Sequence, residues 1–165
     1  MGILNKVGVL FKSGTFQTSD EGWYVTCGQD KKKKISSIMS YEIRTKPLNH
    51  MIIFFGGKEG KELENAPEVF FTRIRSVLSK TFGDAFQERI IKFIHSSWGL
   101  NEFSLGSYSY ALPGTSNDRE LLQKSLDKKL FFAGEATSDY FYGTCHGAYL
   151  SGIRVAEEII SKLDT

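Results

Sequence analysis

A run of small residues that follows a glycine and an acidic residue is the part of this chain best suited to hold an electron-rich ligand. Residues 130–133 read Leu-Phe-Phe-Ala, which is typical of a buried strand, and the small residues lie where we expect helix 144–163 to begin. Small side chains let the unpaired N–H groups of a helix start approach a ligand, and the helix dipole favours negative charge there. The candidate ligand-binding residues are Gly134, Glu135, Gly143, Thr144 and Cys145.

A lysine lies between apolar residues near the start of the chain. Residues 3–11 have a strand pattern, and alternation places Lys6 on one face with Leu4, Gly8 and Leu10. A lysine in a strand usually faces solvent or guards a sheet edge. A desolvated cation beside a reaction centre can instead polarise a bound oxygen species. The pattern alone leaves both roles open.

Trp98 and the segment 106–114, which reads Gly-Ser-Tyr-Ser-Tyr-Ala-Leu-Pro-Gly, form a third candidate region. Trp98 and Tyr108 carry large apolar surfaces, so their simplest role is in a hydrophobic core.

The elements that must position these residues are strands and two helices. A proline at position 67 and apolar residues at helical spacing predict helix 67–82, while the later helix 144–163 is apolar on more than one face and is expected to be largely buried. The lysines at 31–34 are expected to cap an exposed hairpin. A net charge of only +2 and the lack of a second basic patch argue against nucleic-acid or anionic-membrane binding. Further strands are expected at 23–27, 35–43, 51–55 and 89–96.

These segments together resemble the C-terminal portion of the flavin-dependent amine oxidases, and most of all the polyamine oxidase and histone-lysine demethylase branch. The resemblance implies an α+β (mixed α/β) fold and non-covalent FAD. It also implies that Glu135 contacts the ribityl or pyrophosphate part of FAD, beside Gly134 and Gly143. The backbone at Thr144 and Cys145 would face flavin O2 and N1, where a helix dipole stabilises the anionic reduced ring.

The same resemblance gives roles to the remaining candidates. Lys6 would hold a water against flavin N5, Trp98 would lie beside the flavin, and Tyr108 would form one wall of the substrate passage. Ser107 stands where monoamine oxidases carry the cysteine that bonds to the flavin, and a serine cannot form that thioether. Thr144 falls at the second aromatic wall, so the two-ring cage is incomplete, which favours bulkier or more polar amines.

The resemblance implies two partial domains. Residues 1–97 would be part of a substrate-binding domain, and residues 98–165 part of an FAD-binding domain. A Gly-x-Gly-x-x-Gly turn for the ADP part of FAD is missing, because Gly56, Gly57 and Gly60 are followed by 61–64 and not by a helix on a parallel strand. We expect either a fragment of a complete oxidase or a natural half-length protein.

The expected activity is that of a polyamine oxidase-like enzyme, in which a neutral amine loses hydride to flavin N5 and O2 reoxidises the flavin to give H2O2. One alternative is a non-catalytic remnant or interaction module that pairs with a chain supplying the Rossmann half. Another is a related flavoprotein that oxidises a substrate other than an amine.

No metal site is expected from the spacing of the three histidines. With two cysteines and no signal peptide or membrane-spanning run, a cytoplasmic location is expected. The Ser-Lys-Leu tripeptide at 161–163 is followed by two residues, so it is not a terminal peroxisomal signal.

Overall fold

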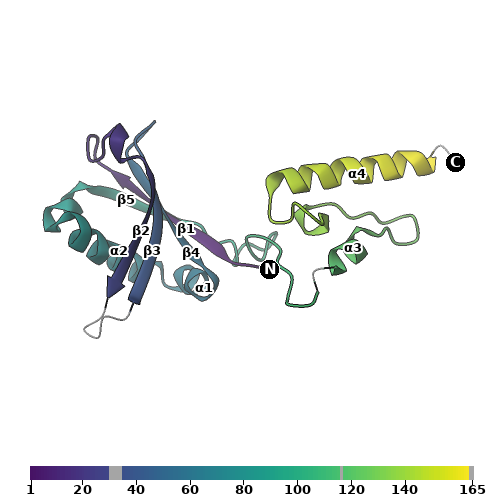
Figure 1. Cartoon of the computed structure of the whole chain (residues 1–165), viewed down its shortest axis with the longest axis horizontal. Coiled ribbons are helices and arrows are strands. Elements are labelled where there is room, and N and C mark those ends of the chain that lie inside the picture. Colours follow the sequence, from purple (N-terminus) through teal and green to yellow (C-terminus); the bar gives the residue numbers. More distant parts are fainter. Residues whose placement is uncertain (30–34, 116, 164–165) are drawn as a thin grey trace. The chain divides into compact units, whose positions relative to one another are not determined.

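The structure, a computed structural model, describes residues 1–29, 35–115 and 117–163 (Figure 1). The chain forms two compact units. The sheet unit is Ile3–Leu105, and the C-terminal unit is Met1–Gly2 with Gly106–Thr165. The division between the two units therefore falls between Leu105 and Gly106. The assignment of residues 1–97 and 98–165 to a substrate-binding and an FAD-binding domain stays a prediction. The lysine cluster at 31–34 lies outside the described residues.

The sheet unit is built on one five-stranded sheet with the order β2-β3-β4-β1-β5. Every pair of neighbouring strands is antiparallel. All five strands correspond to strands expected from the sequence. Their bounds are β1 Leu4–Phe11, β2 Gly22–Gln29, β3 Ile35–Arg44, β4 His50–Gly56 and β5 Ile90–His95.

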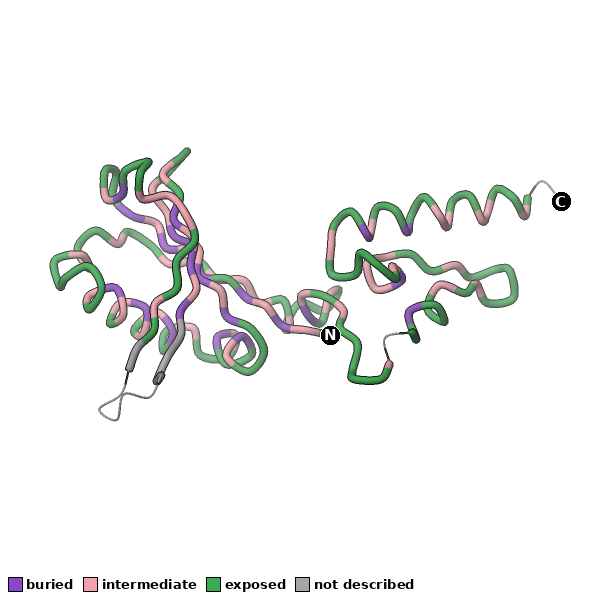
Figure 2. Tube along the Cα trace, viewed as in Figure 1, coloured by how far each residue is buried: buried purple, intermediate pink, exposed green. Residues whose placement is uncertain are grey.

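Helix α2, Pro67–Phe82, closes the core on one face of this sheet. Its buried residues Phe70, Ile74 and Leu78 recur at helical spacing, as the sequence pattern predicts. They pack with the inward side chains of β1 and β4, and the rings of Phe55 and Phe70 meet edge to face at 5.0 Å. Figure 2 shows the buried positions along the strands and on α2.

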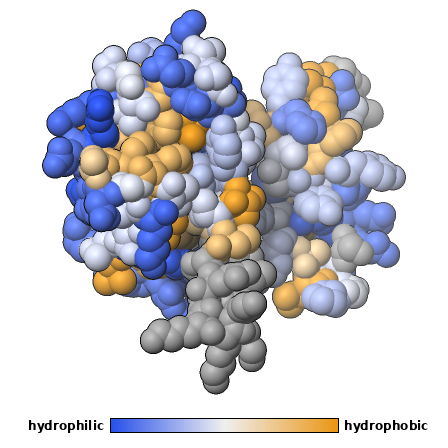
Figure 3. All heavy atoms as spheres, turned by 60° about the vertical axis from the view of Figure 1, so that its left-hand side comes forward, coloured by the Kyte–Doolittle hydropathy of each residue, from blue (hydrophilic) through white to orange (hydrophobic). Residues whose placement is uncertain are grey.

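The opposite face of the sheet is not covered by any described element of this unit. In β1 the residues alternate between fully buried and more exposed positions, so that Val7 and Val9 point into the core and Lys6 points away from it. Trp23 and Val25 of β2 are both exposed. Figure 3, turned so that the left-hand side of Figure 1 comes forward, shows apolar residues gathered in patches among hydrophilic ones.

A helix that sequence analysis missed follows β4. Helix α1, Gly57–Asn65, buries Gly60 and Leu63. The glycines in this run therefore do open a helix, although the sheet that it contacts is antiparallel and not the parallel sheet of a dinucleotide-binding turn. The signals were Glu59 in the first turn and the Lys58–Glu62 pair at i,i+4 spacing.

The C-terminal unit is held together by polar contacts. It contains α3, Asp118–Gln123, a 3-10 turn at Glu135–Thr137, and α4, Cys145–Leu163. Every buried large hydrophobic residue among the described residues belongs to the sheet unit. The buried polar side chains of the C-terminal unit are those of Arg119, Thr137 and Ser151.

Two expectations for this unit are wrong. Residues 130–133 form no strand, because only Leu130 pairs, in a single bridge with Leu126, and no described strand lies alongside to complete a ladder. Helix α4 begins and ends close to the predicted bounds but is not largely buried. Only Gly147 and Ser151 are buried, whereas Tyr149 and Ile160 are mostly exposed, because no described segment covers their apolar faces.

The described parts of the chain contain neither a membrane-spanning helix nor a cluster of metal ligands. No helix there is both long and apolar enough to cross a bilayer. No three His, Cys, Asp or Glu side chains there gather as metal ligands would.

The contrast between the two units predicts uneven protection from hydrogen exchange. The amide groups of Ile153 and Ile160 in α4 should exchange ~100-fold faster than those of Val7 and Ile53, because few buried contacts oppose local opening of α4. Exchange followed by NMR measures this, with Ile74 in the buried part of α2 as a helical control. Equal protection of α4 and α2 in the isolated chain would contradict it.

Candidate functional site

Lys6 extends from an interior strand on the uncovered face of the sheet. β1 lies between β4 and β5, so the alternative that Lys6 guards a sheet edge is wrong. The predicted alternation is confirmed, with Lys6 exposed and Val7 buried. The Lys6 Nζ lies 5.6 Å from the ring centroid of Phe54, its register partner on β4. A cation is thus presented beside an aromatic surface.

Sequence analysis missed the aromatic neighbours of Lys6. The exposed ring of Trp23 on β2 stacks on Phe54, with the ring centroids 4.9 Å apart and an angle of 22° between the planes. Trp23 and Phe54 come from strands separated in the sheet by β3. The alternation within each strand could assign their faces, but only the register brings the two rings together.

Trp98 follows β5 in the same unit. Its side chain is 46% exposed, so it is not a core aromatic. Its backbone N–H donates to Oδ1 of Asn5 at 3.1 Å, and Asn5 directly precedes Lys6. The Ser96 Oγ accepts a hydrogen bond from the Lys6 N–H at 2.9 Å. The structure therefore brings together the backbones of two candidate residues that are far apart in the sequence.

Ser107 and Tyr108 lie at the start of the long segment of the C-terminal unit. Gly2 pairs with this segment, because its N–H donates to the Tyr108 carbonyl at 2.7 Å and its carbonyl accepts from the Ser107 N–H at 2.8 Å. The Tyr108 ring lies against Gly2, where an added Cβ would come within 2.8 Å of it. Tyr108 is partly exposed and not a core residue.

Glu135 joins three segments of the C-terminal unit. Its Oε1 accepts from the Ser109 N–H at 2.7 Å, and its Oε2 accepts from the Ser109 hydroxyl at 2.7 Å and from the Gly143 N–H at 2.6 Å. Arg119 Nη1 donates to the Ser109 Oγ at 2.8 Å and to the Ala136 carbonyl at 2.9 Å. The carboxylate thus fixes both the tyrosine-bearing segment and the loop before α4.

The charge on Glu135 is stabilised by these contacts. Partial burial raises the pKa of its carboxyl group, but the hydrogen bonds from Gly143 and Ser109, with the nearby Arg119 guanidinium, outweigh burial and lower the pKa below its ordinary value. Glu135 is therefore an anion at neutral pH.

Contacts within the C-terminal unit explain some of the small residues at the start of α4. The Thr144 Oγ1 accepts from the Gly147 N–H at 3.1 Å, which caps the helix. A Cβ on Gly147 would lie 2.0 Å from the Phe141 carbonyl oxygen, so Gly147 is required by the loop that packs on it. Among the described residues, none accepts a hydrogen bond from the N–H groups of Cys145 or His146. These two groups are available to a ligand.

Two glycines beside this helix start border open space. Gly134 and Gly143 have φ angles of 130° and 70°, which favour glycine, and an added Cβ at either position would meet no atom within 4 Å. Unlike Gly147, they leave room next to Glu135 for a group that is not part of this unit.

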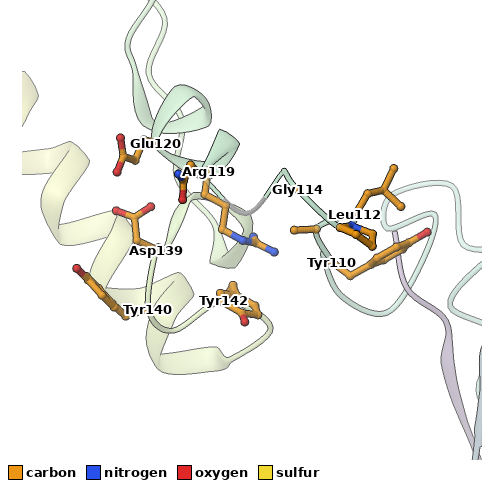
Figure 4. Close-up of a pocket in the computed structure, with 11 residues that line it drawn as sticks. Tyr110, Leu112, Gly114, Arg119, Glu120, Asp139, Tyr140 and Tyr142 are labelled. Carbon is orange, nitrogen blue, oxygen red and sulfur yellow. The ribbon is translucent and has the colours of Figure 1, made fainter.

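Sequence analysis also missed a pocket in the C-terminal unit (Figure 4). It has a volume of about 620 Å³. The Arg119 guanidinium, in a residue only 6% exposed, lies 4.2 Å from the ring centroid of Tyr142 in its wall. Glu120 and Asp139 contribute carboxylates to the same lining. Because Arg119 also holds Ser109, one buried cation connects this pocket to the Glu135 network.

The hydrogen bonds of Glu135 predict a pH-dependent order of the loop. Since the folded pKa is lowered, the stabilisation is fully present above the unfolded pKa and is lost as the pH falls through the folded pKa. At neutral pH, Glu135→Gln should speed exchange of the Gly143 amide by ~10-fold relative to the unaltered chain, and this ratio should shrink in acid. Glu120→Gln is the control, and a ratio that does not change with pH would contradict the prediction.

The close approach at Gly147 predicts opposite effects of alanine at two glycines of α4. Gly147→Ala should destabilise the helix start by about 1–3 kcal/mol through overpacking on Phe141. Gly152→Ala should be neutral or stabilising by up to about 1 kcal/mol, since an added Cβ there meets nothing within 4 Å and alanine favours helix. Amide exchange along α4 measures both effects, and a harmless Gly147→Ala would contradict the packing.

Comparison with known proteins connects this geometry to a family. Lysine-specific histone demethylase 1 homolog 2 of Arabidopsis thaliana is 30% identical over 164 residues, which cover 96% of this chain and 22% of that protein. Polyamine oxidase 2 of Arabidopsis thaliana is 46% identical over 69 residues, which cover 41% of this chain and 14% of that protein. The chain thus spans about a fifth of the length of the first of these relatives.

The solved structure of cyclohexylamine oxidase from Brevibacterium oxydans IH-35A matches with a TM-score of 0.70 and 22% identity, over 100% of this chain and 36% of that one. It confirms the expected mixed fold of part of a flavin amine oxidase. The family model for flavin containing amine oxidoreductase matches residues 1–160, nearly the whole chain. The resemblance seen in the sequence is therefore confirmed, and the chain belongs to the flavin-containing amine oxidoreductase family.

Proposed function

We propose that this chain forms the amine-facing wall and one side of the cofactor site of an FAD-dependent, polyamine oxidase-like enzyme. The observation that carries the proposal is Lys6, a cation on the uncovered face of an interior strand. The residue before it, Asn5, accepts a hydrogen bond from the Trp98 N–H. The similarity to polyamine oxidase 2 and to lysine-specific histone demethylase 1 homolog 2 supports the joint polyamine oxidase and histone-lysine demethylase branch. In this proposal the sheet unit belongs to the substrate-binding domain and most of the C-terminal unit to the FAD-binding domain.

The residues around Glu135 fit a flavin dinucleotide. The open space at Gly134 and Gly143 and the N–H groups of Cys145 and His146 provide room and donors for electron-rich atoms. Thr144 would fix this helix start through its cap. Glu135 already accepts three hydrogen bonds from the chain, so it would mainly shape the site, with capacity for one further donor such as a ribityl hydroxyl.

Ser107 has no thiol for a covalent bond, so these residues would hold FAD non-covalently. When bound, FAD would supply the oxidation of a neutral amine to an imine, with O2 as the final electron acceptor and H2O2 as a product. The chain's own residues would arrange this reaction. The Lys6 ammonium would hold a water at the N5 edge, and Trp98 and Tyr108 would frame the amine. The exposed Trp23 ring and the partly exposed Phe54 ring, which lies beside Lys6, would contact the alkyl chain of the amine.

The ADP part of FAD needs a phosphate-binding turn that is not among these residues. We therefore propose that the chain is inactive alone and acts with a polypeptide segment that supplies this turn. The exposed apolar residues of α4, and the lack of buried large hydrophobic residues in the described C-terminal unit, support such a partner. The alternative is a non-catalytic interaction module that uses the same apolar surface.

The test is flavin retention and peroxide production. The purified chain, alone and co-expressed with the phosphate-binding segment of polyamine oxidase 2, is incubated with FAD, freed of unbound cofactor and supplied with polyamines or methylated lysine peptides. We expect flavin absorbance near ~450 nm and peroxide only with the segment present. A complex that binds flavin but oxidises no amine would favour the interaction module, and a complex without flavin would overturn the proposal.

Lys6 gives a sharper prediction within the active complex. Lys6→Met should slow reoxidation of the reduced flavin by O2 by ~10–100-fold, because the cation that holds the N5 water is lost. Lys92→Met is the matched control, since Lys92 is exposed on the neighbouring strand and pairs with Leu10, a residue of the same face as Lys6. Stopped-flow absorbance measures the rate, and equal rates for the two variants would remove Lys6 from the mechanism.

A further inference from the structure

Asn5 has a fully satisfied polar side chain in the core of the sheet unit. It is 0% exposed, and the residues two positions away on either side, Ile3 and Val7, are buried and apolar. Its Nδ2 donates to the Gly60 carbonyl at 3.0 Å and to the Glu64 Oε1 at 2.7 Å. Its Oδ1 accepts from the Ser96 Oγ and from the Trp98 N–H, each at 3.1 Å. These four contacts use the two donors and two acceptor positions of the amide.

The contacts of Asn5 lead directly to the two proposed catalytic residues of this unit. Ser96 exchanges two bonds with Lys6, since its Oγ accepts from the Lys6 N–H at 2.9 Å and its own N–H donates to the Lys6 carbonyl at 3.0 Å. The Glu64 Oε1 also accepts from the Gly99 N–H at 2.7 Å. The side chains of Asn5, Glu64 and Ser96, called the Asn5 clamp below, therefore tie β1 and the Trp98 loop to helix α1.

Close packing leaves the clamp little freedom. A Cβ on Gly60 would lie 2.7 Å from Ile3 Cγ2 and 2.8 Å from the Phe55 carbonyl oxygen. A Cβ on Gly99 would lie 2.5 Å from the Glu64 Oε2. Helix α1 thus approaches Ile3 and Phe55, and the Trp98 loop approaches Glu64 of α1, as closely as glycine permits, which leaves the hydrogen-bonding atoms little room to move.

We infer that Asn5 and Glu64 are positioning residues that set the placement of Trp98 relative to Lys6. The catalytic meaning of this inference rests on the proposed function, but the placement itself does not. Asn5 and Lys6 are adjacent in β1, so the alternation of the strand turns Asn5 into the core and Lys6 to the uncovered face. The clamp therefore lies on the core side of the sheet, whereas Lys6 extends from the opposite face. Its carboxylate comes from α1, the helix that sequence analysis missed.

A purely structural role makes a different prediction from a positioning role. If the clamp served only the stability of the core, its loss would loosen the whole sheet unit evenly. If it positions the Trp98 loop, the loss is local to the amides that it binds. The Gly99 amide, bonded to Glu64, and the Ile53 amide in β4 separate the two cases.

The experiment is site-resolved amide exchange on the full chain without cofactor. Glu64→Ala should speed exchange at Trp98 and Gly99 by ~10-fold or more while Ile53 stays within ~2-fold. Glu64→Gln keeps the accepting oxygen and should restore slow exchange. Glu62→Ala, on the exposed side of the same helix, is the matched control. Equal acceleration at Ile53, or unchanged exchange at Gly99, would overturn the inference.

A second readout follows the exposure of the Trp98 side chain. In a Trp23→Phe background, Trp98 is the only tryptophan, and its fluorescence quenching by acrylamide should rise about 2-fold in Glu64→Ala and not in Glu64→Gln. Unchanged quenching in Glu64→Ala would count against the clamp.

Catalysis supplies the last, separate comparison. In a complex that turns over, Glu64→Ala should lower kcat by ~10-fold with the amine KM nearly unchanged, because the loss lies in geometry and not in amine binding. If Glu64→Ala speeds amide exchange locally but no complex binds flavin, the positioning role of the clamp is supported and the proposed function is overturned. A normal kcat despite faster exchange would overturn the catalytic meaning of the clamp.

Discussion

Burial of only one face of the sheet is the constraint on which the rest of this structure depends. The inward residues of β1 and β4 pack on α2 and complete the core, and the strict alternation of a strand then turns their neighbours outward. Lys6 cannot turn inward without moving every core residue of β1 to the wrong face. A one-sided core therefore determines where the cation stands, and the same rule places Phe54 beside it.

The C-terminal unit is organised by a different kind of interaction. Hydrogen bonds to the Glu135 carboxylate and from the Arg119 guanidinium hold its segments together, whereas its apolar side chains remain largely exposed. Directional polar contacts specify geometry but contribute little net stability. Such a unit has a defined local shape, while the described residues leave most of its apolar side chains uncovered, in a chain that spans 22% of one relative.

The sequence predicts those parts of the structure that a segment determines by itself or through packing in the core of its own unit. The strands, helix α2 and the outward direction of Lys6 follow from local periodicity. The predictions of a strand at 130–133 and of a largely buried α4 are wrong, because both features need neighbouring segments that the described residues do not supply. Asn5 was missed as a positioning residue since its partners, Gly60, Glu64, Ser96 and Trp98, are 55 to 93 positions away. Pairings at such distances have no signature in a single sequence.

The pairing of Gly2 with Ser107 and Tyr108 makes the sheet unit an insertion into the C-terminal unit. The chain leaves for the sheet at Ile3 and returns at Leu105, next to the residues that bind Gly2. Closing a loop of this length has an entropic cost that grows only slowly with the number of residues enclosed. Between homologous proteins, a segment with adjoining ends can be exchanged or lengthened as a block, so the sheet unit can diversify while the hydrogen bonds of Glu135 are inherited unchanged.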